Sequence, residues 1–240
     1  MEQAGLEAGA GAPTPPAAAK GKPVATKPSF FQDVEVFVGV RDQGSRLRIT
    51  EPAPARALTA GQFSPAGMSG SGHVDGRLRF VGYGITAPEA HWDDFAGLDA
   101  NGLKGQIAVV LRGVPANKFS GGAARSYSDL RFKAWSAREK GAAAVVFVDL
   151  TSDSVPKLTL DGPEGGAGLP VLYLAKSLLP TLGIKIAGEA STPTDGAALA
   201  AALEKAANEG KPASIELSAH LTGDVNLARE SRRERNVVGV

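Results

Sequence analysis

Apolar and polar residues alternate in two short segments near the start of the chain. Residues 34–38 and 46–49 follow the period of two that half-buried strands show, and we predict that they form a hairpin-like pair. Residues 1–28 show no period and consist mainly of Ala, Gly, Pro and Lys, which is typical of a disordered tail or linker. A stretch rich in Gly and Pro, residues 52–72, separates the strand pair from everything that follows.

A helix is predicted between two buried strands in the middle of the chain. Residues 106–111 and 143–148 are continuous apolar runs suited to buried strands. Residues 129–140 carry apolar side chains on one side and charged ones around the other, and Gly141 is placed to end that helix. The order predicts a βαβ unit with a parallel strand pair, in a mixed α/β fold of the α+β class. Further elements are expected at residues 78–81, 169–174 and 215–221 (strands), 197–208 (a helix) and 236–240 (the start of a last strand).

Composition excludes several classes of function. Lys and Arg total 26 against 25 Asp and Glu, so the formal charge of +1 is evidence against a nucleic-acid partner. The most apolar run, residues 142–148, is far too short to span a membrane. Because the chain has no Cys, disulfides, Cys-ligated zinc and thiol nucleophiles are excluded. Glu2 and Glu7 with no apolar segment after them do not form a signal peptide.

The three histidines do not form a convincing metal site. His73 and His91 each begin a His-x-Asp pattern, which paired zinc hydrolases use at the end of a buried strand. Here His73 follows Ser-Gly-Ser-Gly and His91 follows Pro-Glu-Ala, so we favour surface or turn positions over metal ligation. His220 lies in a predicted edge strand with no acidic neighbour nearer in sequence than Glu216 and Asp224.

Other chemical motifs are equally weak. Residues 82–87 fit G-x-G-x-x-A after a strand, but the segment that follows lacks the periodicity of the helix a dinucleotide site needs, so a Gly-dependent turn is favoured. Asp93 and Asp94 form an acidic pair that more often caps a turn than performs catalysis. No G-x-S-x-G elbow is present, and the charged residues 229–235 are typical of a solvated connector. We therefore assign no catalytic residue and no metal ligand.

Three longer segments of the chain carry a family resemblance. These are Phe-Val-Gly-Tyr-Gly-Ile-Thr-Ala-Pro-Glu at 80–89, Trp-Asp-Asp-Phe-Ala-Gly-Leu-Asp at 92–99 and Leu-Lys-Gly-Gln-Ile-Ala-Val-Val-Leu-Arg-Gly at 103–113. Together they resemble the protease-associated (PA) domain of bacterial zinc aminopeptidases, of the co-catalytic two-zinc type related to aminopeptidase Y. The resemblance covers about residues 72–240 and implies a bent β-sheet or open β-barrel flanked by two or three helices.

The resemblance also implies a larger parent enzyme. In that family the PA domain is inserted into a peptidase domain, and two zinc ions are bound by residues that follow the strand beginning here at Asn236. No zinc or catalytic residue of the family can therefore be placed on this chain, which we expect to be an internal piece. Its parts are expected to be a tail (1–28), a strand pair connecting from the peptidase domain (29–72), the PA domain (73–228) and a connector with a truncated strand (229–240).

Our leading hypothesis is a non-catalytic PA module that acts as a lid, substrate-positioning wall or protein-interaction module. The parent would be an extracellular or periplasmic aminopeptidase, and the partners would be the missing peptidase domain and a peptide or protein substrate. Tyr83, Trp92 and Arg112 are candidates to face a ligand because each lies near a strand end, although ordinary packing or exposure is favoured for each. An apolar patch is expected around Phe30, Phe31 and residues 237–240, where the peptidase domain would pack.

Two alternatives remain open. The first is a free-standing domain that binds peptides or a partner protein and has no enzymatic parent. The second is a nucleotide-binding α/β enzyme, which rests on residues 82–87 alone.

Overall fold

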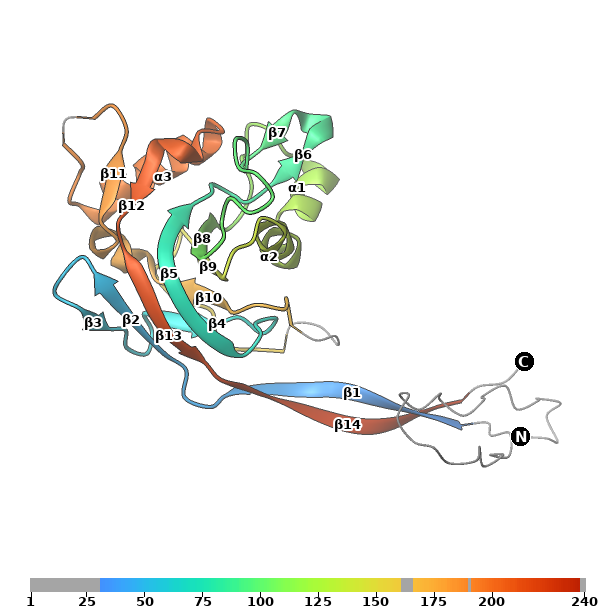
Figure 1. Cartoon of the computed structure of the whole chain (residues 1–240). Coiled ribbons are helices and arrows are strands. Elements are labelled where there is room, and N and C mark those ends of the chain that lie inside the picture. Colours follow the sequence, from blue (N-terminus) through green and yellow to red (C-terminus); the bar gives the residue numbers. More distant parts are fainter. Residues whose placement is uncertain (1–30, 161–165, 190, 238–240) are drawn as a thin grey trace. The chain divides into compact units, whose positions relative to one another are not determined.

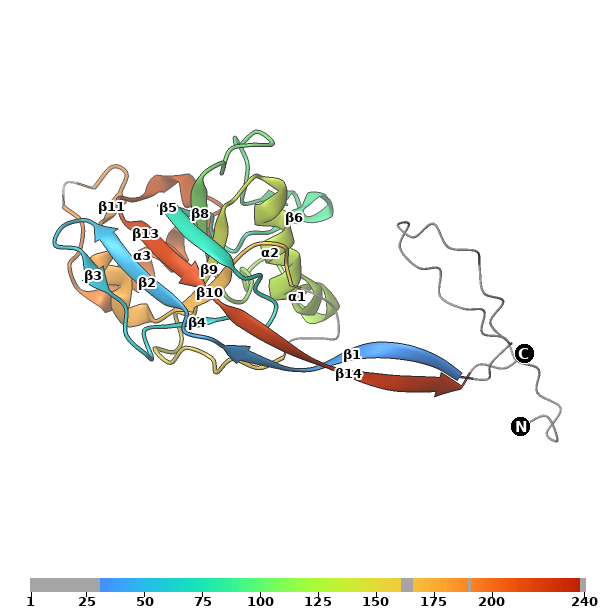
Figure 2. The same cartoon turned by 60° about the horizontal axis from the view of Figure 1, so that its bottom comes forward.

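The computed structural model of the chain describes residues 31–160, 166–189 and 191–237. Residues 40–228 form one compact unit, in which eight strands build a mixed sheet with the order β3-β2-β13-β5-β8-β9-β10-β4. The sheet curls, with β5 visibly bent in Figure 1, and β2, β13, β5 and β8 lie side by side in Figure 2. In that order the strands are Arg56–Ala57, Arg46–Glu51, His220–Val225, Gly72–Phe80, Gln106–Leu111, Ala144–Val148, Val171–Leu174 and Phe63–Pro65. The predicted α+β class with a bent sheet is confirmed.

Four neighbouring strands run parallel, and they contain the predicted βαβ unit. β5, β8, β9 and β10 pair in parallel, and the other pairs in the sheet are antiparallel. Helices α1 (Gly121–Tyr127) and α2 (Leu130–Glu139) connect β8 to β9. The Asp129 carboxylate caps α2 by accepting from the backbone N–H groups of Arg131 and Phe132, and Gly141 has φ +86° beyond its end. The helix expected at residues 129–140 is therefore confirmed.

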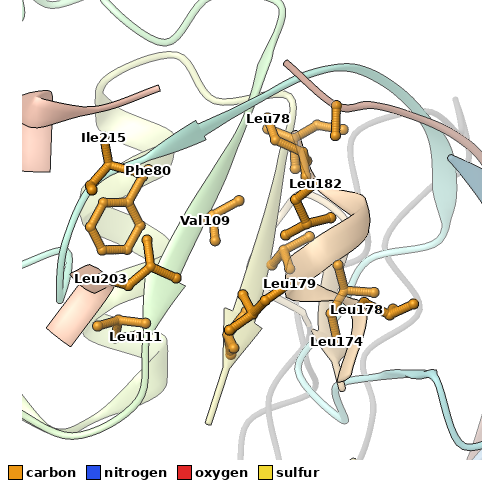
Figure 3. Close-up of a cluster of buried hydrophobic side chains, with 14 of the residues drawn as sticks. Leu78, Phe80, Val109, Leu111, Leu174, Leu178, Leu179, Leu182, Leu203 and Ile215 are labelled. Carbon is orange, nitrogen blue, oxygen red and sulfur yellow. The ribbon is translucent and has the colours of Figure 1, made fainter. Parts of the chain in front are cut away.

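Each face of the parallel strands has its own apolar core. On one face, Ile107, Val109 and Leu111 of β8 pack with helices α3 (Gly196–Asn208) and η3 (Lys176–Thr181), as the close-up in Figure 3 shows for Val109 and Leu111. The intervening residues of β8, Ala108 and Val110, face a second core that includes Ala134 and Ala137 of α2. Strands buried on both faces need continuous apolar runs, which is why β8 and β9 were recognisable from sequence.

The strand expected at residues 215–221 is in fact two strands. β12 (Ile215–Leu217) pairs with β11 (Ile184–Ile186), whereas β13 begins at His220 and pairs with β2 and β5. The chain changes partner at Ser218 and Ala219, whose N–H groups donate to the carbonyls of Gly183 and Leu182, between η3 and β11. His220 consequently lies on an interior strand of the sheet, and its expected place on an edge strand was wrong.

The remaining short elements lie outside the large sheet. β6 (Thr86–Ala87), η2 (Pro88–Ala90) and β7 (Trp92–Asp93) form a small hairpin after β5, and η4 (Pro212–Ser214) leads into β12. No described helix is long and apolar enough to cross a membrane.

A second unit, residues 1–39 and 229–240, contains a two-stranded sheet of β1 (Phe31–Asp42) and β14 (Leu227–Val237). Asp33 pairs with Arg235 and Gly39 lies against Glu230, so the strands run antiparallel. The predicted pairing of residues 34–38 with 46–49 was wrong, because β2 pairs with β3 and β13 instead. Residues 229–235, which the sequence predicted to be a solvated connector, form part of β14 and pair with β1. The apolar patch expected around Phe30, Phe31 and residues 237–240 lies outside the residues whose side chains are described.

Candidate functional site

The carboxyl ends of the parallel strands place two of the three candidate residues near one cavity. Parallel strands end at the same edge of a sheet, and ligands of α/β folds commonly bind there. The segment after β5 carries Tyr83 and Trp92, and the loop after β8 carries Arg112. A cavity of about 610 Å³ lies between the β6–β7 hairpin, the loop after β8 and the end of α3.

Trp92 forms part of the wall of this cavity. It pairs with Ala87 in the β6–β7 hairpin and is only 6% exposed. The Lys118 ammonium stands over its ring, 5.9 Å from the centroid, and Phe119 packs edge-on against it with the centroids 6.3 Å apart. Gly210 lies against the far part of the indole, since a Cβ there would be 3.5 Å from the ring. The indole is therefore fixed by neighbours from three segments.

Tyr83 is buried beside the cavity and contacts the end of α3. Its hydroxyl donates to the Asn208 side-chain oxygen at 3.0 Å, and Asn208 lines the cavity. Burial, together with the smaller effects of the Glu204 and Asp94 charges, raises the Tyr83 pKa to about 12. The Lys133 ammonium lies 5.3 Å from the centre of the Tyr83 ring. Tyr83 thus links α2, α3 and the segment after β5.

Asp94 holds the turn that contains Tyr83. One carboxylate oxygen accepts from the backbone N–H groups of Tyr83 at 3.1 Å and Ile85 at 3.0 Å. The other oxygen is buried without a hydrogen-bond partner, as is the Trp92 indole nitrogen, although that N–H is near enough to lower the Asp94 pKa. Burial is the larger effect and raises the Asp94 pKa to about 6. A Cβ on Gly82, whose φ is +59°, would come within 2.9 Å of this carboxylate.

Asp93, the other member of the acidic pair, and the Gly-rich segment 82–87 both belong to turns. Asp93 accepts from the backbone N–H of Phe95 and from the Thr86 hydroxyl. After Gly84 the chain enters β6 and the short 3₁₀ helix η2, and no α-helix opens there. The expected Gly-dependent turn is present, since Gly82 and Gly84 have φ of +59° and +66° and η2 follows in place of an α-helix.

Lys133 is a fully buried cation that no sequence motif indicated. It is 0% exposed on α2, and its ammonium donates to the carbonyl oxygens of Leu111, at 3.1 Å, and Gly113. Burial lowers its pKa to about 7, and the nearby Asp94 charge opposes that shift. The sequence places Lys133 beside apolar Ala134 in the helix, but one charged residue in an amphipathic pattern gives no sign of burial. Its role is to hold the start of the loop after β8.

Arg112 lies apart from the cavity lining. Its guanidinium forms an ion pair with Asp149 at 2.8 Å and stands 5.8 Å from the centre of the Tyr173 ring. The side chain is 37% exposed, so the pair contributes little to stability. Hydrogen bonds from Thr151, together with the Arg112 charge, lower the Asp149 pKa despite the opposing effect of burial.

The histidines are distributed over the fold. His73 Nδ1 donates to an Asp224 carboxylate oxygen at 2.9 Å, which raises the His73 pKa, and His91 occupies a turn with φ 49°. His220 lies 3.4 Å from Asp75 and 3.2 Å from the Thr50 hydroxyl. Sequence reasoning missed these partners because they come from neighbouring strands. Within the described ranges, no group of three or more His, Asp or Glu side chains is arranged to hold a metal ion.

Comparison with known proteins shows a likeness in fold. No protein-family model matches the chain, and no curated protein matches it significantly. Among solved structures, the aminopeptidase from Aneurinibacillus sp. strain AM-1 is 20% identical with a TM-score of 0.50 over 87% of this chain. A peptidase M28 precursor from Shewanella amazonensis SB2B (14% identity over 86% of the chain, TM-score 0.42) and a zinc aminopeptidase from Bacillus subtilis (16% over 85%, TM-score 0.42) also match.

The matched region is a minor part of each of those proteins. The chain spans 37% of the Aneurinibacillus aminopeptidase, 40% of the Shewanella protein and 35% of the Bacillus enzyme. At these identities the likeness establishes the fold alone.

Proposed function

We propose that this chain is the non-catalytic PA module of a secreted, zinc-dependent aminopeptidase. Its role there would be that of a lid, a substrate-positioning wall or a protein-interaction module for the peptidase domain. The observation that carries the proposal is the agreement of two independent lines. The Phe-Val-Gly-Tyr-Gly-Ile segment and its companions resemble the PA domain, and the fold that they build is similar to part of an aminopeptidase.

The chemistry of the described residues supports a module without its own active site. The buried ionisable groups, Asp94 and Lys133, are engaged with backbone groups of loops, and His73 and His220 pair with single carboxylates. Two-zinc hydrolysis needs several converging imidazole and carboxylate ligands with an open position for water. In the proposed arrangement those ligands, and the two zinc ions, belong to the peptidase domain of the parent.

An activity assay tests this proposal. The purified chain is incubated with zinc and leucine p-nitroanilide, and the release of nitroaniline is compared with zinc alone. We expect equal rates for the two samples. A rate well above that of zinc alone, which the double variant His73→Ala/His220→Ala abolishes, would show a catalytic site in this chain. That result would overturn the proposal.

One exposed side chain favours a protein-binding role within the same proposal. Trp135 of α2 is 55% exposed, and Arg131 and Arg138 lie one helical turn to either side. Trp and Arg are the residues that most often dominate the energetics of protein interfaces. An interaction surface on α2 would fit a module that packs against another domain, and Trp135→Ala would weaken that association without unfolding the chain.

A further inference from the structure

The cavity beside Trp92 has the features of a site for a positive charge. Its lining includes Trp92, Asp93 and Glu209, and the Glu209 carboxylate also pairs with Lys211 at 3.4 Å. Glu209 directly follows α3, so the partial negative charge at the carboxyl end of this helix of 13 residues adds to the charges of the two acids. An aromatic face, two acids and a helix C-terminus all stabilise a nearby cation.

A cation of the chain itself already stands at this place. The Lys118 ammonium lies 5.9 Å from the centre of the Trp92 ring. Lys118 is exposed and, among the described residues, takes part in no ion pair. It belongs to the loop between β8 and α1, and loops of this kind can move their side chains at little cost. The side chain thus occupies the position that a ligand ammonium would take.

The volume of the cavity leaves room for a ligand. The cavity of about 610 Å³ is larger than one lysine side chain requires, so it has room for a ligand when Lys118 turns away.

We propose that this cavity, lined by Trp92, Asp93 and Glu209, binds a primary alkylammonium group, and that Lys118 competes for the same position as an internal ligand. The proposal does not depend on the aminopeptidase parent, since it rests on this cavity alone. The ammonium could be carried by a lysine side chain of a polypeptide or by a free polyamine. Both present the same chemistry to the indole face.

A fluorescence titration tests the site directly. The chain has two Trp residues, so the Trp135→Phe variant leaves Trp92 as the sole reporter. Butylammonium chloride is titrated at constant ionic strength, with butanol as the uncharged control. We expect a saturable change of Trp92 emission with a dissociation constant on the order of millimolar for the amine and none for the alcohol. No saturable change, or the same change with butanol, would overturn the proposal.

Matched variants in the same background separate the site from general electrostatics. Lys118→Met removes the internal cation while keeping a flexible side chain of similar length, so the affinity for butylammonium should rise about tenfold. Lys185→Met changes another exposed lysine, on β11 outside the cavity, and should leave the affinity unchanged. Equal affinities in Lys118→Met and the parent, or equal gains in both lysine variants, would contradict competition by Lys118.

Removal of one acid completes the design. Glu209→Gln should weaken butylammonium binding several-fold while the circular dichroism spectrum stays unchanged; unaltered affinity would remove Glu209 from the site. Spermidine and N-acetyl-lysine amide are then compared, and the tighter binder identifies the source of the ammonium. If neither produces the emission change that butylammonium produces, the assigned ligand class is wrong.

Discussion

The two faces of the parallel strands bury their side chains in different ways. On the face covered by α3 and η3 the buried cluster is formed by apolar side chains, among them Leu199 and Leu203 of α3. On the other face, α2 also buries Lys133 and Ser136, and Lys133 holds the loop after β8. The α3 face therefore supplies stability through burial, whereas the α2 face combines burial with positioning of the loops at the carboxyl edge.

The largest expected effect comes from opening a cavity on the α3 face. Leu203 is 1% exposed, and Leu203→Ala removes apolar volume that the surrounding helix and strands cannot fully replace. We expect the free energy of unfolding to fall by about 3 kcal/mol, as measured by urea denaturation. Ala200→Gly, at a half-buried position in the same helix, serves as control and should cost about 1 kcal/mol. Similar losses for the two variants would contradict the role given to the α3 face.

The next effect concerns the buried cation on the α2 face. The folded chain lowers the Lys133 pKa to about 7, so the unfolded chain binds more protons between pH 7 and 10.5. The free energy of unfolding should rise with pH in that window because of this group, by at most about 1.4 kcal/mol per pH unit. Lys133→Met should flatten this rise, as followed by urea denaturation from pH 4 to 9.

Asp94 changes the free energy of unfolding in a separate pH range and in the opposite direction. Its pKa is raised from 3.8 to about 6, so the folded chain binds more protons and its stability falls as pH rises through that range. A pH profile of Lys133→Met that keeps the rise above pH 7 would show that Lys133 is not the group responsible. A profile that changes only below pH 6 would assign the effect to Asp94 instead.

A smaller loss of stability is expected when the N-terminal cap of either helix is removed. The Asp129 side chain accepts two backbone N–H bonds at the start of α2, and Asp195 accepts one at the start of α3. Asp129→Ala and Asp195→Ala should each cost about 1 kcal/mol, with the larger loss at Asp129. Thermal denaturation of both variants measures the difference, and a larger loss at Asp195 would contradict this ranking.

The smallest effect is expected on the outer surface of α2. Trp135 is 55% exposed, so Trp135→Ser should change the free energy of unfolding by less than about 0.5 kcal/mol. Urea denaturation of this variant beside Lys133→Ala provides the comparison on one helix. A loss of similar size in both would mean that the exposed indole is part of the core.

Sequence patterns predicted those parts of the fold in which burial depends on local periodicity. The apolar runs of β8 and β9 and the amphipathic α2 could be recognised because each is buried along its whole length or on one stripe. The pairing of β2 with β13 could not, since it joins residues about 170 positions apart and alternation does not specify a partner strand. The division of residues 215–221 between two sheets depends on backbone bonds from Ser218 and Ala219, which leave no trace in hydropathy.

The residues selected from sequence as candidates to face a ligand lie in different surroundings. The position of Trp92 near a strand end indicated that it could face a ligand, and the structure places it in a cavity wall. Arg112 was selected on the same ground but forms an ion pair with Asp149 instead of lining that cavity. Lys118 and Glu209 escaped notice because exposed charged residues are common. Only the fold brings the loop after β8 and the end of α3 to the same indole.

The most direct test of the central claim is the zinc content of the purified chain. The protein is equilibrated with excess zinc, passed through a desalting column and analysed by elemental mass spectrometry. If the chain is the proposed non-catalytic module, it should retain no stoichiometric zinc. Retention of one or two ions per chain, lost on substitution of a histidine, would contradict the account.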